Sequence, residues 1–176
     1  MTNNCMKYVG GAITVFPARG RVLEVGSYDV NGSVRPLFKN LHRFPSYLGV
    51  DMREGPGVDQ VCMASELPFS DESFEVVVTT EMLEHDARFW VSVQEFNRVL
   101  TPGGHLIITT RNIGFPYHEY PHDLWRFTSD GLRQLLQWAK FEVLDAKDDW
   151  SEHGTFATGR KSRYAGRQIG RWGKTE

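Results

Sequence analysis

Apolar residues along this chain follow two different spacings in alternation. Seven short runs rich in valine, isoleucine, leucine and phenylalanine have the length and composition of β-strands. The predicted strands cover residues 21–25, 47–51, 58–62, 74–80, 105–110, 141–146 and, with a weaker pattern, 154–159. Several are apolar on both faces, which is typical of parallel strands covered by helices on both sides.

Three segments between these runs repeat their apolar residues every three or four positions, as amphipathic helices do. They cover residues 34–41, where Pro36 falls in the first turn, 89–100, and 132–139. Pro102 and two glycines after it are expected to end the second helix. The alternation predicts an α/β fold in a single domain, with a doubly wound, mostly parallel seven-stranded sheet.

Two acidic residues mark the ends of the first two predicted strands. Glu24 lies near the end of one strand, two residues before Gly26, where it can face a positive charge. Asp51 ends the next strand, where a carboxylate can accept both hydroxyls of a ribose. Ligands of doubly wound sheets bind beyond the carboxyl ends of the strands. The pair therefore indicates a cofactor with a nucleoside and a cationic amino-acid end.

The loop after the first strand argues against phosphate-rich cofactors. Gly26 and Gly32 are separated by "SYDVN", so the GxGxxG pattern of nicotinamide-binding loops is missing. No Gly-Lys-Ser/Thr sequence follows Gly26 in this loop either, which disfavours a P-loop there.

Four segments in order resemble the successive motifs of class I S-adenosylmethionine-dependent methyltransferases. They are "LEVGSYDVNG", "YLGVD", "ASELPFSDESFEVVVTTEMLEH" and "RVLTPGGHLIITT", and the resemblance covers about residues 20–146. It implies a Rossmann-like fold and S-adenosyl-L-methionine as cofactor. The sequence departs from the family where Tyr28 and Asp29 replace common glycines, and where Met63 replaces a frequent aspartate.

The resemblance also implies roles for individual residues. Asp51 would hold the ribose hydroxyls, Met52 would pack on the adenine, and Ala64 would offer backbone contacts to the adenine edge. Glu81 and Met82 would line the sulfonium and the path to the acceptor. The residues that would border the methionine end are Glu24, Gly26, Ser27 and Tyr28.

The segment 114–132, "GFPYHEYPHDLWRFTSDGL", is expected to cover the open end of the site. Its aromatic and polar residues suit a lid that excludes water. A structural plug, with Trp125 and Phe127 buried and Asp123 paired to Arg126, is the alternative. "YPHDLWRFT" resembles a lid in a methyltransferase subgroup of glycan pathways, which suggests a sugar-like acceptor.

Histidines near this end of the sheet are the candidates for catalysis. His85 follows the fourth strand and is the leading general base for a hydroxyl acceptor, while His118 and His122 on the lid come next. The alternative for His85 is a structural hydrogen bond to a neighbouring carboxylate. No set of acids has a spacing that indicates a metal site, so none is expected.

Composition and charge limit the classes of molecule that the protein is expected to bind. The 176 residues are 40% hydrophobic and 24% charged, with a net charge of −2, which favours a small-molecule acceptor over nucleic acid or a membrane. Cys5 and Cys62 are far apart, as expected of reduced thiols in a cytoplasmic protein. No export signal is recognised. The predicted methyltransferase domain covers residues 1–160, and a basic tail follows at 161–176.

Three functions remain open from the sequence. The first is O-methylation of a small hydroxylated, sugar-like or glycan-precursor acceptor. The second is methylation of nitrogen, although "TEML" replaces the (D/N/S)PP(Y/F) motif of DNA amine methyltransferases. The third is a non-catalytic, methyltransferase-like binding module.

Overall fold

The fold is built on one seven-stranded sheet, seen in a computed structural model that describes residues 1–119 and 122–163. The strand order is β3-β2-β1-β4-β5-β7-β6. The strands are β1 (Arg21–Val25), β2 (Ser46–Asp51), β3 (Gln60–Val61), β4 (Phe74–Thr80), β5 (Leu100–Arg111), β6 (Phe141–Asp149) and β7 (Gly154–Lys161). All seven predicted strands are present, and β1 to β5 are parallel to one another.

The sheet is mostly parallel, as predicted, but it is mixed because one strand runs in the opposite direction. β7 inserts between β5 and β6 and is antiparallel to both. The physical reason is the connection from β6 to β7, which spans only residues 150–153. A link this short can only reverse the chain, because a parallel pair needs a crossover of a dozen or more residues.

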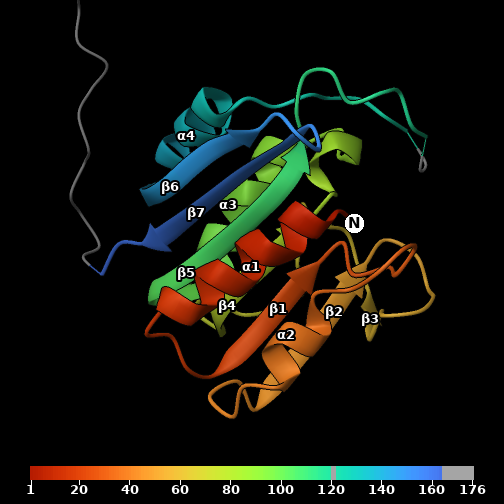
Figure 1. Ribbon diagram of the computed structural model, residues 1–176. Helices are drawn as coiled ribbons and strands as arrows, with labels where there is room; N and C mark the ends of the chain where they lie inside the picture. Colours follow the sequence, from red (N-terminus) through yellow and green to blue (C-terminus); the bar gives the residue numbers. More distant parts are fainter. Residues whose placement is uncertain (120–121, 164–176) are drawn as a thin grey trace, which may run out of the picture.

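Helices cover both faces of the sheet (Figure 1). One face carries α1 (Asn3–Val15) and α2 (Arg35–Lys39), whose Val9, Ile13 and Phe38 pack on Val22, Val76 and other strand residues. The other face carries α3 (Phe89–Val99) and α4 (Ser129–Trp138) over a second core. A short 3₁₀ helix, η1 (Leu83–His85), follows β4.

The first helix, α1, was not expected from the sequence. Gly10 and Gly11 lie in its middle, and glycine weakens a helix by about 1 kcal/mol per residue. Thr2 caps its first turn, and Cys5, Val9 and Ile13 form a buried stripe at four-residue spacing. Burial of that stripe outweighs the weak propensity.

The boundary between α3 and β5 also differs from expectation. The helix ends at Val99, and Leu100 is already the first residue of β5. Pro102 and the two following glycines therefore lie inside the strand, where the pairing with β4 is irregular between Phe74 and Val76. A proline lacks the N–H that a regular ladder requires, which fits this irregularity.

The strand order reverses between β1 and β4. From β1 the chain continues to β2 and β3 on one side, and from β4 it continues to β5 on the other side. In doubly wound sheets this switch point is where ligands bind. The described residues include no helix that is long and apolar enough to cross a lipid bilayer. The basic tail predicted from residue 161 begins inside β7, which ends at Lys161, and residues 164–176 of that tail lie outside the described residues.

Candidate functional site

A cavity of about 370 Å³ opens at the carboxyl ends of β1, β2 and β4. Every predicted site residue lines it, although these residues come from five separate segments of the chain. They are Glu24, Gly26, Ser27, Tyr28, Asp51, Met52, Ala64, Glu81, Met82, His85, His118 and His122. The sequence therefore located the cavity, whereas the roles of the individual residues rest on the geometry described below.

The turn after β1 needs glycine at its first position. Gly26 has a φ of +82°, and a Cβ there would come within 2.6 Å of the Met82 side chain. The N–H groups of Gly26 and Ser27 both donate to the carbonyl of Val50, at 2.9 and 3.0 Å. The tight turn brings the β1 and β4 loops together at the cavity.

Tyr28 fits at a position where the family commonly has glycine because Gly55, which has no side chain, lies against its ring in space. A Cβ at Gly55 would lie 2.0 Å from the Tyr28 ring, so the ring occupies the space that a side chain would take. The guanidinium of Arg53 lies over the same ring, 5.5 Å from its centre. The 51–57 loop thus supports the β1 loop from the side.

Glu24 is a buried acid at the edge of the cavity. Its side chain is almost fully buried, and burial raises its pKa to about 7. The nearby positive charge of Arg35 opposes this effect, while Arg35 itself is paired to Asp59 at 2.5 Å. One carboxylate oxygen of Glu24 has no hydrogen-bond partner. That oxygen is free to accept a hydrogen bond from a cationic group.

Asp51 presents an oriented carboxylate at the end of β2. Its two oxygens accept the N–H groups of Arg53 at 3.1 Å and Tyr28 at 3.3 Å. Met52, half exposed, and Ala64 lie beside it on the cavity wall. The carboxylate next to an apolar surface has the chemistry that a ribose and an adenine ring require.

Glu81 adopts an unusual backbone conformation directly after β4. Its φ is +55°, which non-glycine residues rarely adopt outside functional sites and tight turns. The Glu81 N–H donates to the Thr109 carbonyl at 2.8 Å, and the side chain forms an ion pair with Arg111 at the end of β5. These two contacts hold the turn in place.

Glu84 is fully buried one turn further on, next to Glu81. Its Oε2 accepts a hydrogen bond from Thr110 Oγ1 at 2.7 Å, whereas its Oε1 has no hydrogen-bond partner. Burial, together with the negative charge of Glu81, raises the pKa of Glu84 to about 8. Glu84 was not among the predicted site residues.

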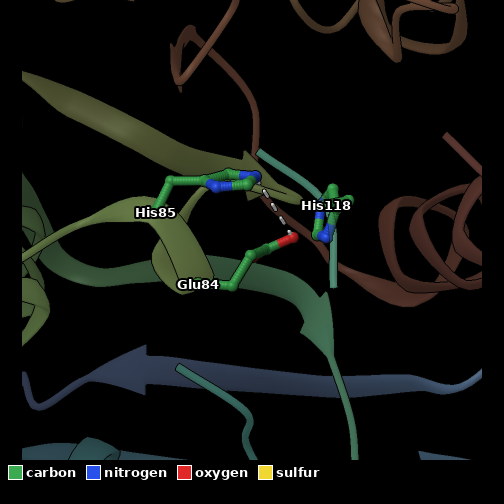
Figure 2. A group of neighbouring side chains, drawn as sticks. All are labelled: Glu84, His85 and His118. Carbon is green, nitrogen blue, oxygen red and sulfur yellow. Dashed lines mark ion pairs between the residues drawn. The ribbon is translucent and has the colours of Figure 1, made fainter. Parts of the chain in front are cut away.

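His85 lies against Glu84 and against the lid (Figure 2). Its Nε2 is 3.9 Å from Glu84 Oε1, and its ring centre is 4.8 Å from that of His118. The Nδ1 of His85 lies 2.6 Å from the backbone carbonyl oxygen of His122. A carbonyl only accepts hydrogen bonds, so Nδ1 carries the proton and the Nε2 of the neutral ring keeps a free lone pair.

The lid is held by ion pairs and backbone hydrogen bonds. The Asp123 side chain is fully buried, pairs with Arg126, and accepts the His118 N–H at 2.8 Å. The Arg126 guanidinium keeps the pKa of Asp123 well below its usual range. Leu124 and Trp125 donate their N–H groups to the Glu84 carbonyl, at 2.8 and 3.1 Å.

The plug interpretation of the lid is confirmed in part. Asp123 and Arg126 are paired as expected, and Phe127 is buried against Phe89. Trp125 is 39% exposed instead, with its indole N–H donating to the Asp86 carbonyl at 3.0 Å. In the described part of the chain, Trp125 is not among the residues that line the cavity.

Glu84 and Arg111 are among the residues at the site that the sequence did not predict, and the reasons differ. Glu84 was visible in "EMLEH", but nothing in the spacing showed that it would be buried beside two histidines. Arg111 is the last residue of β5. Its position at the carboxyl end of a strand, where ligands bind, was the signal that could have identified it. Its pairing with Glu81 joins strands that are adjacent in space and 30 residues apart in sequence.

Comparisons with known proteins agree with this architecture. The sequence profile of a methyltransferase domain family matches residues 10–108. Phthiotriol/phenolphthiotriol dimycocerosates methyltransferase 1 of Mycobacterium ulcerans is 36% identical over 129 residues, which cover 66% of this chain and 46% of that protein. The chain thus spans about half the length of the curated relatives it matches.

Solved structures show the same fold at low sequence identity. A Burkholderia thailandensis 1,6-didemethyltoxoflavin-N1-methyltransferase, with S-adenosylhomocysteine bound, matches with a TM-score of 0.72 at 18% identity over 91% of this chain and 77% of that chain. A chain from the complex between the Haloferax volcanii Trm112 methyltransferase activator and a methyltransferase matches with a TM-score of 0.71, at 15% identity and 90% coverage of both chains.

The family profile spans more than half of the chain, from α1 to β5, and includes the loops that form the cavity after β1, β2 and β4. The cofactor of this family is S-adenosylmethionine, as the acidic strand ends and the four motifs predicted. The chain belongs to the methyltransferase domain family, among the class I S-adenosylmethionine-dependent methyltransferases.

Proposed function

We propose that this chain transfers the methyl group of S-adenosylmethionine to a hydroxyl of a small, sugar-like acceptor. The observation that carries the proposal is His85, which lines the cavity and whose Nε2 keeps a lone pair while its Nδ1 donates to the His122 carbonyl. A hydroxyl must lose its proton to become an ether, and this lone pair is a proton acceptor in the right place.

The cofactor would lie along the ends of the three central strands. Glu24, Gly26, Ser27 and Tyr28 would hold the methionine end, where the unpartnered oxygen of Glu24 can accept from the cofactor's ammonium group. Asp51 would accept the ribose hydroxyls, with Met52 and Ala64 against the adenine. The sulfonium would then lie near Glu81 and Met82, on the side that faces the histidines.

The reaction in this arrangement is an in-line displacement. The acceptor oxygen forms a bond to the methyl carbon while the carbon–sulfur bond breaks, and the bonding pair stays on sulfur as a neutral thioether. The hydroxyl proton passes to Nε2 of His85. His118 and His122, also on the cavity wall, would orient the acceptor. The lid keeps water away, so that most of the rate enhancement comes from alignment of the two reactants.

A hydroxylated acceptor with an apolar portion is a second candidate. Leu124 on the lid lines the cavity and is 43% exposed, and Met82 adds further apolar surface. The Mycobacterium ulcerans relative is named as a methyltransferase of phthiotriol and phenolphthiotriol dimycocerosates. Both candidates share the hydroxyl chemistry and differ only in what surrounds the hydroxyl.

The geometry also bears on the other functions that the sequence left open. A non-catalytic binding module would be expected to fill its acceptor channel, and Trp125 is directed to the Asp86 carbonyl instead. Nitrogen methylation needs no strong proton acceptor when the amine is neutral, so the oriented histidine favours oxygen over nitrogen.

The experiment that tests the proposal is an acceptor screen by release of S-adenosylhomocysteine. Matched pairs of acceptors, such as a methyl glycoside and an octyl glycoside of the same sugar, separate the two candidates. Turnover with both members indicates a sugar-like acceptor, and turnover with the octyl member alone indicates an apolar one. Turnover confined to amine analogues of the same compounds would overturn O-methylation.

A further inference from the structure

Glu84, His85 and His118 bring three metal-binding side chains to one point of the cavity wall (Figure 2). Each offers one ligand atom, and these three atoms lie within 4.8 Å of one another. His85 Nε2 and Glu84 Oε1 are 3.9 Å apart. Ligand atoms around a tetrahedral zinc ion are separated by about 3.4 Å. Small side-chain rotations are therefore enough to bring the three ligand atoms to that separation.

A hydrogen bond orients the ring of His85, and an acidic residue lies beside the ring of His118. Nδ1 of His85 donates to the His122 carbonyl at 2.6 Å, which directs the bare Nε2 toward Glu84. Nδ1 of His118 lies 3.3 Å from Oδ2 of the buried Asp123. Metal-binding histidines usually bond a carbonyl or carboxylate through their second nitrogen, as His85 does with the His122 carbonyl.

The buried carboxylate supplies an independent observation. Glu84 is 0% exposed, and its Oε1 faces the two rings without a hydrogen-bond partner. Buried polar atoms in native proteins almost always have a hydrogen-bond partner. A buried oxygen without one therefore indicates that a ligand occupies the place of the partner. The other oxygen of the same carboxylate is already bonded to Thr110, which fixes the direction in which Oε1 points.

We propose that Glu84, His85 and His118 bind one divalent metal ion of the zinc type, with at least one coordination position open to the cavity. Two imidazoles and one carboxylate are the ligands of catalytic zinc sites that keep an open position. Magnesium and calcium prefer sites built from oxygen alone, so the donor set disfavours both. No spacing pattern indicates this site, because His118 comes from the lid, 33 residues after His85.

This inference deepens the proposed function and rests on it for the role of the ion. The ion would coordinate the acceptor oxygen at its open position and stabilise the alkoxide form. His85 would then act as a ligand in place of the proton-accepting role given above, and the hydroxyl proton would be released to solvent when the acceptor oxygen binds the ion. The reaction still forms one C–O bond and breaks one C–S bond.

Metal binding is tested on the untagged full chain without reference to activity. After dialysis against a chelator, the protein is titrated with Zn²⁺ and with Co²⁺, whose visible spectrum reports ligand number and geometry. We expect one ion per chain and no competition from Mg²⁺. Glu84→Gln and His118→Ala should each weaken Zn²⁺ binding about a hundredfold. The matched control is His42→Ala, which removes an exposed histidine outside the cavity and should bind like the wild type.

S-adenosylmethionine titration of the same samples reports whether each variant is folded. If Glu84→Gln does not fold, His118→Ala carries the test, because His118 lies on the surface segment. Zn²⁺ affinity that is equal in the wild type and in a folded Glu84→Gln or His118→Ala variant would overturn the site, as would the absence of stoichiometric binding.

Comparing zinc binding with turnover, in chelator-stripped and in zinc-loaded protein, tests the role of the ion separately from the proposed function. Stoichiometric zinc binding without turnover of any hydroxylated acceptor would support the site and refute the O-methylation. Turnover that is the same in chelator-stripped and zinc-loaded protein would overturn the catalytic role of the ion. Turnover that is lost on stripping and restored by zinc would support it.

Discussion

His85 gains its chemical character from one hydrogen bond. The contact of Nδ1 with the His122 carbonyl leaves Nε2 unprotonated in the neutral ring, on the cavity wall. His85→Ala should bind S-adenosylmethionine as the wild type does, because the contacts proposed for the cofactor's methionine end and ribose lie at the β1 and β2 loops. Turnover should fall about a hundredfold, the lower end of what general-base catalysis contributes. Single-turnover rates with an identified acceptor measure the change, and full turnover in this variant would rule out a role for His85.

His105 is a second histidine with a distinct environment, far from the cavity wall. It is buried in β5, its ring stacks on Phe16 with centres 4.1 Å apart, and burial lowers its pKa to about 4. The unfolded chain takes up a proton near pH 6.5, whereas the folded chain resists it. The free energy of unfolding should therefore fall as the pH drops from about 6.5 to about 4, by up to about 3 kcal/mol.

Urea unfolding at several pH values checks this prediction. His105→Gln keeps a polar side chain of similar size and removes the titration, so its stability should vary less over the same range. An equal pH dependence in the variant and the wild type would mean that other groups cause the acid sensitivity.

The lid is an element whose order depends on one ion pair. Asp123 is fully buried and holds both Arg126 and the His118 N–H. Asp123→Ala should weaken the local structure of the lid by about 2 kcal/mol, the scale of hydrogen bonds to a charged group. Hydrogen exchange at the amides of His118, Leu124 and Trp125 should accelerate accordingly.

The matched control for the lid is Asp71→Ala, which breaks an Asp–Arg pair whose aspartate side chain is 74% exposed. That change should leave lid exchange as it is, because exposed pairs contribute little. Since the pKa of Asp123 is lowered, its contribution is present above pH 4 and disappears as the pH falls below that value. Unchanged exchange in Asp123→Ala would show that backbone contacts alone order the lid.

Elements with clear periodicity were predictable, and elements set by tertiary contacts were not. The strands β1, β2 and β4 end at or within a residue of the expected positions because their apolar runs stop at polar or glycine residues. Helix α1 was missed because its two central glycines hide a stripe that only burial stabilises. The direction of β7 follows from the short link to β6, and its place between β5 and β6 follows from pairing that sequence periodicity does not encode.

The same distinction applies to the site. Acids and glycines at strand ends indicated the part of the cavity that we propose for the cofactor, because topology alone brings those ends together. The cluster of Glu84, His85 and His118 depends on how the lid folds back over β4, which no local pattern specifies. Burial of Glu84, the feature that changes its chemistry most, is likewise a consequence of the three-dimensional structure.

The described part of the molecule ends at residue 163, just after the last strand, β7. Lys161 Nζ donates to the Leu100 carbonyl at 2.7 Å and lies 3.6 Å from Glu72, so β7 is secured at this residue. Truncation after Arg163 should change the free energy of unfolding by no more than about 0.5 kcal/mol. Truncation after Arg160 also removes the Lys161 contacts and should lower it by about 1 kcal/mol.

Thermal unfolding with and without S-adenosylmethionine measures both truncations. Six basic residues and one acidic residue lie between Arg160 and the end of the sequence, so a contact with phosphate groups of a substrate or partner is the alternative role for the tail. Selective loss of acceptor turnover after removal of residues 164–176 would support that role. Loss of cofactor binding would refute a dispensable tail.

The measurement that tests the account most directly is calorimetric titration of the chain with S-adenosylmethionine, in the wild type and in Asp51→Ala. Asp51 is held by two backbone N–H groups at the cavity, while Asp130 is an exposed acid in α4 and serves as the control. The account predicts one site per chain, binding that is weaker by about 1–3 kcal/mol in Asp51→Ala, and no change in Asp130→Ala. Absence of binding by the wild type, or equal affinity in Asp51→Ala, would contradict the assignment of this cavity to the cofactor.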